Sequence, residues 1–149
     1  MKIIDSMKIR TFNKTDSNAV IQLWIDCNLV VPQNNPVRDI ERKMKVNSEW
    51  FLVGELEGKI MASCMAGYDG HRGWIYYLAV APQFQKHGYA RQMMEHVEKL
   101  LKAAGCPKIN LQVRETNQKV IKFYESIGFA DDEVVSFGKR LETDELYKV

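Results

Sequence analysis

The residues with the clearest chemical meaning in this chain of 149 residues lie in one stretch, Leu78 to Ala90. An apolar run ends at Ala81, a short polar turn follows, and apolar residues at helical spacing begin at Tyr89. Such a junction directs unpaired backbone N–H groups and the positive end of a helix dipole at one point. Since Gly88 lets an anion approach the backbone without a Cβ in the way, the stretch predicts a phosphate site.

Cationic side chains add to the positive character of this turn; they are Lys86, His87 and Arg91. The turn lacks the Gly-Lys-Ser/Thr of a P-loop and the second glycine of a dinucleotide fingerprint, which argues against a nucleotide triphosphatase or a dehydrogenase. On its own, the pattern Gln85-x-x-Gly88-x-Ala90 is more typical of an ordinary turn between a strand and a helix. A second motif is needed to favour a binding site.

That second motif follows on the next predicted strand–helix unit, and it reads Asn117-x5-Phe123-Tyr124-Glu125-x2-Gly128-Phe129. Together the two motifs resemble those of the GNAT superfamily of N-acetyltransferases, Gln/Arg-x-x-Gly-x-Gly/Ala and Asn-x5-Phe/Leu-Tyr-Glu-x2-Gly-Phe. The resemblance extends from Met7 to about Arg140 and includes the order of the elements. It implies an acetyl-CoA-dependent N-acetyltransferase whose acceptor is a primary amine of a small molecule or peptide.

The resemblance also implies where acetyl-CoA binds. In such proteins the pyrophosphate lies on the backbone amides of the turn, and the pantetheine arm pairs like an extra strand with the edge of the preceding strand. The residue at the position of Asn117 contacts the pantetheine arm. The implied cofactor-binding residues are Leu78, Ala79, Val80, Gln85, Lys86, His87, Gly88, Tyr89, Ala90, Arg91, Asn117 and Tyr124.

Tyr124 occupies the position whose hydroxyl points at the thioester sulfur in the family, so the resemblance makes it the general acid. Attack of an amine on a thioester requires a neutral amine, a polarised carbonyl and a proton for the sulfur. A phenol has an ordinary pKa of about 10, so it is protonated at neutral pH and can donate. The backbone N–H of Val80 is positioned to polarise the carbonyl. The structural alternative for Tyr124 is a core aromatic at helical spacing with Val120 and Ile127.

The general base is the least defined member of the site. Relatives that acetylate the N-termini of ribosomal proteins carry Glu where this chain has Gln112, and an amide does not take up a proton. Other members use a carboxylate on the fourth strand, which residues 74–80 lack. The candidates are Glu115, Asp69 and His71, of which we select Glu115, with a solvated surface charge as its alternative. The departure at Gln112 points away from ribosomal N-termini as the acceptor.

Acceptors of the family enter between the first two helices and the fourth strand. The residues implied to line this entrance are Trp24, Leu29, Val30, Trp74 and Tyr76, and core packing is an equally good interpretation of them. The three cysteines, Cys27, Cys64 and Cys106, lie outside both motifs and lack Cys-x-x-Cys spacing. We therefore expect reduced, buried thiols and direct acetyl transfer in a ternary complex. No His, Cys or Asp cluster has ligand spacing, so no metal is expected.

The periodicity of the sequence predicts the elements that position these residues. Helices are expected after Asp16-Ser17, after Pro36, from Tyr89 to a stop at Gly105 and from Asn117 to a stop at Gly128. Strands are expected at Ile9–Phe12, Trp50–Leu56, Lys59–Tyr68, Gly73–Ala81 and Ile109–Val113, with a last β segment around Val134 to Phe137. In the fourth strand Trp74, Tyr76, Leu78 and Val80 should share one face. The result is an α/β fold, a GNAT-like mixed sheet in which an antiparallel meander joins parallel βαβ units and helices cover both faces.

Length and composition bound the function classes. A chain of 149 residues with 46% hydrophobic and 27% charged residues fits a single domain, 1–149, with residues 1–6 as an extension or alternative start. The net charge of +2 argues against a dedicated nucleic-acid partner.

The longest apolar stretch, Trp74–Ala81, is far shorter than the roughly 20 residues of a membrane span, and no secretory signal precedes it. We expect a cytoplasmic protein without a membrane partner, and the family makes a homodimer possible. The rival interpretations are a non-catalytic acyl-CoA-binding module and an interaction protein of the same architecture.

Overall fold

The computed structural model describes residues 6–149, which divide into two compact units. The first unit comprises residues up to Asn110 together with Asp144–Val149, and the second comprises Leu111–Thr143. Apart from Ser6, the extension predicted for residues 1–6 lies outside the described residues.

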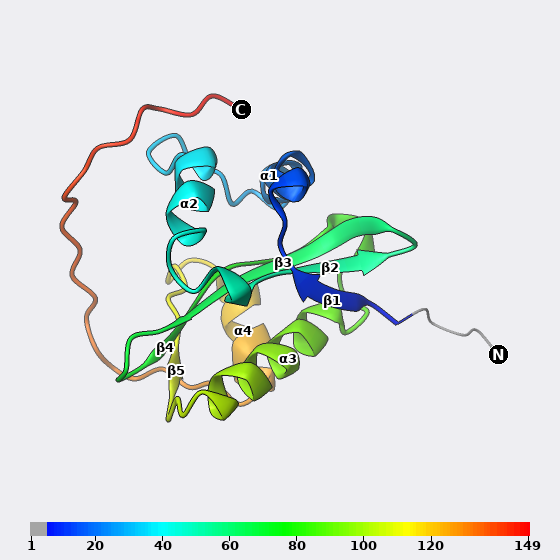
Figure 1. Cartoon of the computed structure of the whole chain (residues 1–149). Helices are drawn as coiled ribbons and strands as arrows, with labels where there is room; N and C mark the ends of the chain where they lie inside the picture. Colours follow the sequence, from blue (N-terminus) through cyan, green and yellow to red (C-terminus); the bar gives the residue numbers. More distant parts are fainter. Residues whose placement is uncertain (1–5) are drawn as a thin grey trace. The chain divides into compact units, whose positions relative to one another are not determined.

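The first unit is built on a five-stranded mixed sheet in the order β1-β2-β3-β4-β5 (Figure 1). The strands are β1 (Lys8–Thr11), β2 (Phe51–Leu56), β3 (Lys59–Tyr68), β4 (Gly73–Val80) and β5 (Ile109–Asn110). The pairs from β1 to β4 are antiparallel, whereas β4 and β5 run parallel. The predicted mixed α/β fold, a meander followed by a parallel crossover, is therefore confirmed.

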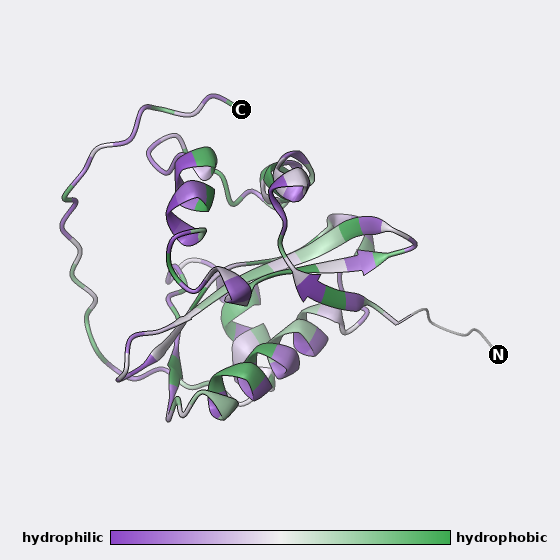
Figure 2. Ribbon diagram, viewed as in Figure 1, coloured by the Kyte–Doolittle hydropathy of each residue, from purple (hydrophilic) through white to green (hydrophobic). Residues whose placement is uncertain are grey.

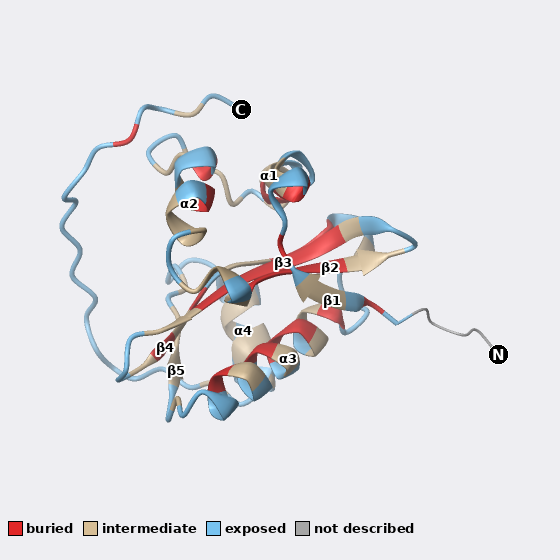
Figure 3. Ribbon diagram, viewed as in Figure 1, coloured by how far each residue is buried: buried red, intermediate tan, exposed pale blue. Residues whose placement is uncertain are grey.

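Helices cover both faces of this sheet, as the apolar character of its central strands predicts. The helices of this unit are α1 (Ser17–Asp26), α2 (Pro36–Lys43) and α3 (Tyr89–Ala103). Figure 1 shows α1 and α2 on one face and α3 on the other. The largest fully buried side chains include Trp24 of α1, Phe51 and Met61 of the sheet and Met93 of α3, so the core fills both layers (Figure 3). Around α3, apolar and polar residues alternate with the helical period (Figure 2).

The two helices on the first face begin in different ways. Pro36 opens α2, and the Asn35 side chain accepts from the N–H groups of Val37 and Arg38, which confirms the predicted start. The predicted start of α1 after Asp16-Ser17 is confirmed, with Asp16 as the N-cap residue, but the Asp16 side chain makes no cap bond to the helix. The Asp16 carboxylate instead accepts from Arg10 and from the Asn13 N–H, so it fastens β1 to the turn before the helix.

A β-bulge interrupts β4. Ser63 of β3 pairs with Ala79 and Met65 pairs with Tyr76, so β4 has one more residue than β3 between these pairs. Within the bulge Tyr77 has a φ of 52°, which is uncommon for a residue with a Cβ. The extra residue reverses the alternation, so the prediction that Trp74, Tyr76, Leu78 and Val80 share one face is wrong beyond Tyr76.

The second unit contains one helix, α4 (Gln118–Ser126), and extended chain. The Asn117 side chain accepts from the Val120 N–H, and Gly128 has a left-handed φ of 100°, so both predicted ends of this helix are confirmed. The β segment predicted around residues 134–137 is wrong, because the described chain forms no strand there and Val134 and Phe137 are 77% and 94% exposed. The strand predicted for 109–113 is shorter than expected and ends at Asn110. Apolar alternation makes a strand only where a neighbouring strand accepts its hydrogen bonds.

Candidate active site

The turn between β4 and α3 forms the centre of the candidate site. A short 3-10 helix, Pro82–Phe84, leads from the strand into this turn, and the Gln85 side chain reaches back to donate to the Val80 carbonyl at 2.9 Å. Gly88 stands at the N-cap of α3 with a φ of 86°, a left-handed conformation that favours glycine. No side chain caps this end of the helix.

The open N-terminus of α3 fits an anionic group. The first hydrogen bond inside the helix runs from the Gln92 N–H to the Gly88 carbonyl at 3.0 Å, so helix geometry leaves the N–H groups of Ala90 and Arg91 without intrahelical acceptors. A Cβ placed on Gly88 would meet no atom within 4 Å, so there is room directly above the backbone. Free amides, the helix dipole and an open cradle are the features that a phosphate requires.

The cations predicted for the turn are exposed beside it. Lys86 and His87 are exposed, and the Arg91 side chain is 63% exposed with a loose ion pair to Glu95 at 3.5 Å. The His87 Nδ1 lies 2.8 Å from the Gln85 carbonyl oxygen, which only accepts, so Nδ1 carries the proton and Nε2 is directed elsewhere. Since exposed side chains reorient readily, these cations suit a ligand that arrives from solution.

One edge of β4 is open beside this turn. Within the first unit β5 pairs only with Gly73 and Trp74, so no strand of that unit follows the edge further. The Ala81 N–H donates to Met61 of β3, and alternation then directs the backbone groups of Leu78 and Val80 toward the opposite, open edge. The Val80 carbonyl accepts from Gln85 and from the Cys27 thiol, while its N–H faces the same edge. The edge can therefore pair with an extended, amide-containing ligand.

The end of α1 and the loop after it lie against this edge. The Cys27 Sγ donates to the Val80 carbonyl at 3.2 Å, which brings the start of the loop close to β4. Leu29 and Val30, the next residues of this loop, are half-buried. On β4 itself, Trp74 is half-buried and Tyr76 is 53% exposed. Four of the predicted acceptor-site residues thus have surface that a second substrate can reach.

Trp24, the fifth predicted acceptor residue, lies in the core. It is completely buried, its ring stacks on Tyr77 with centroids 3.8 Å apart, and its Nε1 donates to Ser63 at 2.9 Å. This placement agrees with the core interpretation of Trp24. Its role at the site is to support Tyr77 from behind.

Tyr77 and Asp39 form a polar pair that the sequence did not reveal. The Tyr77 hydroxyl donates to Asp39 Oδ2 of α2 at 2.6 Å, and Arg42 binds both Asp39 and Asp144. Burial, followed by the neighbouring carboxylate, raises the pKa of Tyr77 well above its usual range. Asp39 reads in sequence as a favourable acid in the first turn of a helix, and Tyr77 is hidden in an apolar run. The one local feature that distinguishes Tyr77 is its positive φ at the bulge, and a backbone angle cannot be read from the sequence.

The carboxylate and imidazole predicted in the turn before β4 are far from Val80. Asp69 Oδ1 accepts from the N–H groups of Arg72 and His71, and these bonds lower the pKa of Asp69. The turn precedes Gly73, so the length of β4, roughly 20–25 Å at about 3.3 Å per residue, separates it from Val80. Asp69 therefore acts as a turn-forming residue, and neither it nor His71 is a candidate base.

The second unit carries the remaining predicted residues. Asn117 caps α4, and the half-buried Tyr124 contacts the rings of Phe123 and Phe129 edge-on, with centroids 5.1 and 5.5 Å apart. Glu115 is exposed just before the helix, where its carbonyl accepts from Gln118. The motif residues of this unit thus lie on one short helix and in the residues immediately before and after it.

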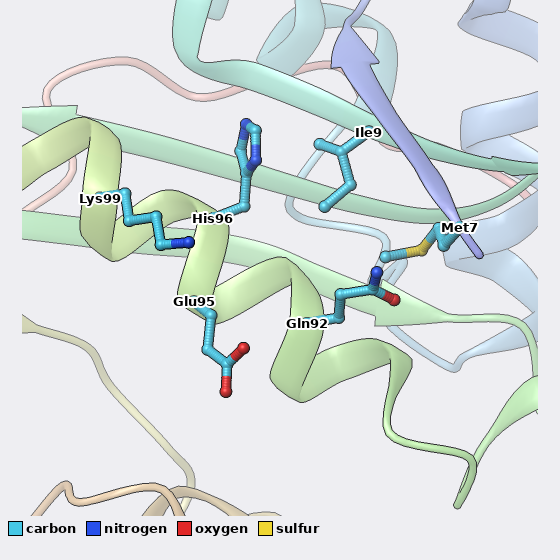
Figure 4. Close-up of a pocket in the computed structure, with 6 residues that line it drawn as sticks. All are labelled: Met7, Ile9, Gln92, Glu95, His96 and Lys99. Atoms are coloured by element: carbon cyan, nitrogen blue, oxygen red, sulfur yellow. The ribbon is translucent and has the colours of Figure 1, made fainter.

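A separate groove of about 370 Å³ lies between β1 and α3 (Figure 4). Its lining residues are Met7, Ile9, Gln92, Glu95, His96 and Lys99. None of the residues predicted for the site lines it. Among the described residues no group of three or more His, Cys, Asp or Glu side chains is arranged to hold a metal ion. No helix of residues 6–149 has both the length and the apolar character that crossing a bilayer requires.

The mixed five-stranded sheet with helices on both faces and an open turn between β4 and α3 define a class, the α/β acyltransferases. Residues 17–129 match the model of the acetyltransferase (GNAT) family. The chain is 47% identical over 141 residues to an acetyltransferase of Yersinia enterocolitica, covering 95% of this chain and all of that one. It belongs to the GNAT family of acetyltransferases and is an N-acetyltransferase, so the interpretation as a mere interaction module is wrong.

Solved structures of the same fold have low sequence identity. The chain superposes on AAC(6')-Iy, solved with the bisubstrate analog CoA-S-monomethyl-acetylneamine, with a TM-score of 0.75 and 20% identity over 91% of this chain and 99% of that one. The ribosomal-protein-S18-alanine N-acetyltransferase of Escherichia coli gives a TM-score of 0.70 and 22% identity over 83% and 77% of the two chains. These likenesses show the fold.

Proposed function

We propose that this protein transfers the acetyl group of acetyl-CoA directly to a primary amine in a ternary complex. The observation that carries the proposal is the juxtaposition of two features, the open cradle at Gly88 and the edge of β4 at Leu78 to Val80, which no strand of the first unit pairs with. The first suits a pyrophosphate and the second suits the amide-containing arm that follows it. A cytoplasmic location is part of the proposal, since the chain retains three free cysteines.

The residues of the turn would hold the diphosphate of acetyl-CoA. The N–H groups of Ala90 and Arg91 at the open start of α3 would donate to it, and Lys86 and His87 add positive charge. Gln85 fixes the turn to the strand through its bond to the Val80 carbonyl. This bond would hold the phosphate-binding turn at a constant distance from the β4 edge where the thioester would lie. Bound acetyl-CoA supplies the acyl thioester, and Asn117 would contact its pantetheine arm.

Two groups of the chain would act on the reacting thioester. The Val80 N–H donates to the carbonyl oxygen as negative charge develops there. The Tyr124 hydroxyl gives its proton to the sulfur that leaves, and the nitrogen of the amine takes its place on the carbonyl carbon. The resemblance of the second motif supports this role for Tyr124.

Two carboxylates are candidates to take the proton that the amine loses. Glu115 stands next to the second motif, and Asp39 accepts a hydrogen bond from Tyr77 at the bulge, directly before the open edge. Asp39 is the better supported, because Arg42 holds its carboxylate and the loop after α1 reaches the same edge. Its proton would pass through water or through the Tyr77 hydroxyl.

The thiol beside the edge does not suit a covalent intermediate. Burial and the nearby Asp26 raise the pKa of Cys27, while its bond to the Val80 carbonyl acts in the opposite direction. A protonated thiol is a poor nucleophile, so direct attack of the amine is favoured. The acceptor class is a primary amine of a small molecule or peptide, and solved structures of the same fold include an aminoglycoside acetyltransferase and an alanine N-acetyltransferase.

Initial-velocity measurements with acetyl-CoA and a panel of amines test this proposal. The panel should include an aminoglycoside, a polyamine and an alanine-initiated peptide. Double-reciprocal lines that intersect are expected for a ternary complex, and Cys27→Ala should retain activity. Parallel lines together with loss of activity in Cys27→Ala would show a cysteine intermediate instead.

A pair of variants separates the two bases. Asp39→Asn should lower kcat by roughly 10- to 100-fold, whereas Glu115→Gln should stay near the parent. The reverse result would assign the base to Glu115.

A further inference from the structure

The last six residues of the chain are fastened to the loop between α1 and α2. Residues 144–149 belong to the first unit, as this loop does. The Asn35 side chain donates to the Glu145 carbonyl at 3.2 Å, and the Tyr147 N–H donates to the Pro32 carbonyl at 3.1 Å. Both bonds go to the backbone of these residues, so they do not depend on the side chain of Asp144.

This attachment places Asp144 against Arg42 of α2. The Arg42 guanidinium donates from Nη1 to Asp144 Oδ2 at 2.9 Å and from Nη2 to Asp144 Oδ1, so the pair is bidentate. The Asp144 side chain is only 4% exposed, and the bond from Arg42 lowers the pKa of Asp144. Asp144 is therefore charged at neutral pH and depends on this arginine as its partner.

Arg42 also lies beside Asp39, but this second contact is much looser. Asp39 and Arg42 are three positions apart on α2, so their side chains lie on one face of the helix. The same Nη1 is 3.5 Å from Asp39 Oδ1, which is longer than an ordinary hydrogen bond. The close bond to Asp39 comes instead from the Tyr77 hydroxyl, at Oδ2. One arginine thus lies between two carboxylates and gives its close bonds to Asp144.

We infer that Asp144 is a positioning residue that holds Arg42 away from Asp39, so that Asp39 Oδ1 can take up a proton during acetyl transfer. The inference rests on the proposed function, in which Asp39 is the base. If Asp144 carried no charge, Arg42 would turn to Asp39, because a guanidinium binds a carboxylate more strongly than a neutral amide. A bidentate pair with Arg42 would stabilise the charged form of Asp39 and oppose proton uptake.

A cycle of variants distinguishes this role from a merely structural one. Asp144→Asn should lower kcat roughly 10-fold and leave the KM for acetyl-CoA unchanged. Adding Arg42→Gln removes the cation that would occupy Asp39, so the double variant should be roughly 5-fold faster than Asp144→Asn. An ion pair that only stabilises the fold predicts a double variant as slow as Asp144→Asn or slower. That result, or an unchanged kcat in Asp144→Asn, would overturn the inference.

Glu145→Gln is the matched control for the change of charge. It removes a carboxylate from the next residue, which contacts Asn35 through its backbone carbonyl and not through its side chain. This variant should have the kcat of the parent. A loss as large as that of Asp144→Asn would show that the negative charge of the C-terminal residues acts at long range, and it would overturn the specific role of Asp144.

A crystal structure of Asp144→Asn tests the placement of Arg42 without any acceptor. The Arg42 guanidinium should form a bidentate pair with Asp39, with Nη1 moving from 3.5 Å to about 2.9 Å from Oδ1. An Arg42 that remains on the side chain of residue 144 would overturn the inference. A parent that acetylates none of the amines would contradict the proposed function, whereas the position of Arg42 in this variant decides the inference separately.

Discussion

The two units of this protein differ sharply in how they are packed. Among residues 6–149, every buried residue belongs to the first unit, including Trp24, Phe51 and Met93. In the second, residues 111–143, no residue is buried, and even the apolar side chains of α4 keep part of their surface in contact with solvent. Most of the packing that stabilises the fold and the proposed phosphate-binding turn thus belong to one unit, whereas the proposed acid belongs to the other. We therefore expect mutations in the first unit to change acetyl-CoA binding and stability, and mutations in the second unit to change the rate of acetyl transfer.

The turn and the second motif illustrate the same contrast at the level of single residues. The turn follows β4, whose carbonyl at Val80 holds Gln85, so its geometry is fixed by the core. Tyr124 is positioned by two aromatic contacts on a helix of nine residues. We expect the first arrangement to be rigid and the second to adjust when ligands bind.

The largest effect should come from opening the core of the first unit. Phe51 is completely buried between Phe12 and Trp24, so Phe51→Ala should lower the free energy of unfolding by about 3–5 kcal/mol. Leu141→Ala in the second unit, at a residue 93% exposed, should change it by less than about 0.5 kcal/mol. Denaturant unfolding measures the free energy of unfolding of both variants. Equal losses in the two variants would contradict the difference in packing between the units.

A smaller effect, confined to catalysis, is expected from the second unit. Tyr124→Phe should lower kcat by roughly 100-fold, equivalent to about 2.7 kcal/mol, with little change in acetyl-CoA affinity or in stability. Tyr68→Phe is the control, because its hydroxyl bonds to Gly70 and Gly105 at the far turn of the sheet. Steady-state kinetics and calorimetric titration separate the two quantities. An unchanged kcat in Tyr124→Phe removes this residue from the mechanism.

The smallest effect concerns the acid sensitivity of the first unit. The Arg10 guanidinium, together with the Asn13 N–H, holds the pKa of Asp16 below its usual value. A lowered carboxyl pKa stabilises the fold above the unfolded value of about 3.9, and that stabilisation is lost as the pH falls through the folded pKa. Asp16→Asn should therefore cost about 1–2 kcal/mol at pH 7 and less at pH 2. Urea unfolding at both pH values measures this, and a cost independent of pH would contradict the assignment.

The first unit could be predicted from the sequence almost completely. The bounds that alternation predicts for β3, Lys59–Tyr68, are the observed ones, and the start that Pro36 predicts for α2 is also observed. The predictions were wrong where the local alternation of apolar and polar residues does not match the strand pairing that the structure shows. Residues 134–137 alternate well but have no described strand beside them, and the bulge at Tyr77 depends on register with β3.

The site could be predicted in part. Gly88 and its neighbours stand at the N-terminus of α3 as expected, because a strand, a turn and a helix start are local features. The pairing of Tyr77 with Asp39 joins positions 38 residues apart, and no local rule reveals such a contact. Likewise the bond from Cys27 to the Val80 carbonyl, which brings the loop after α1 to the open edge, follows only from the packing of α1 on the sheet.

Thermal unfolding with and without acetyl-CoA tests the central claim most directly, in the parent, Gly88→Glu and the control Gly70→Glu. Both glycines have left-handed φ values, 86° and 92°, and open space above them, but only Gly88 lies at the turn. Acetyl-CoA at about 100 times its Kd should raise the Tm of the parent and of Gly70→Glu by roughly 5–10 °C, and should leave Gly88→Glu unchanged. An equal rise in Gly88→Glu, or no rise in the parent, would contradict an acetyl-CoA site at this turn.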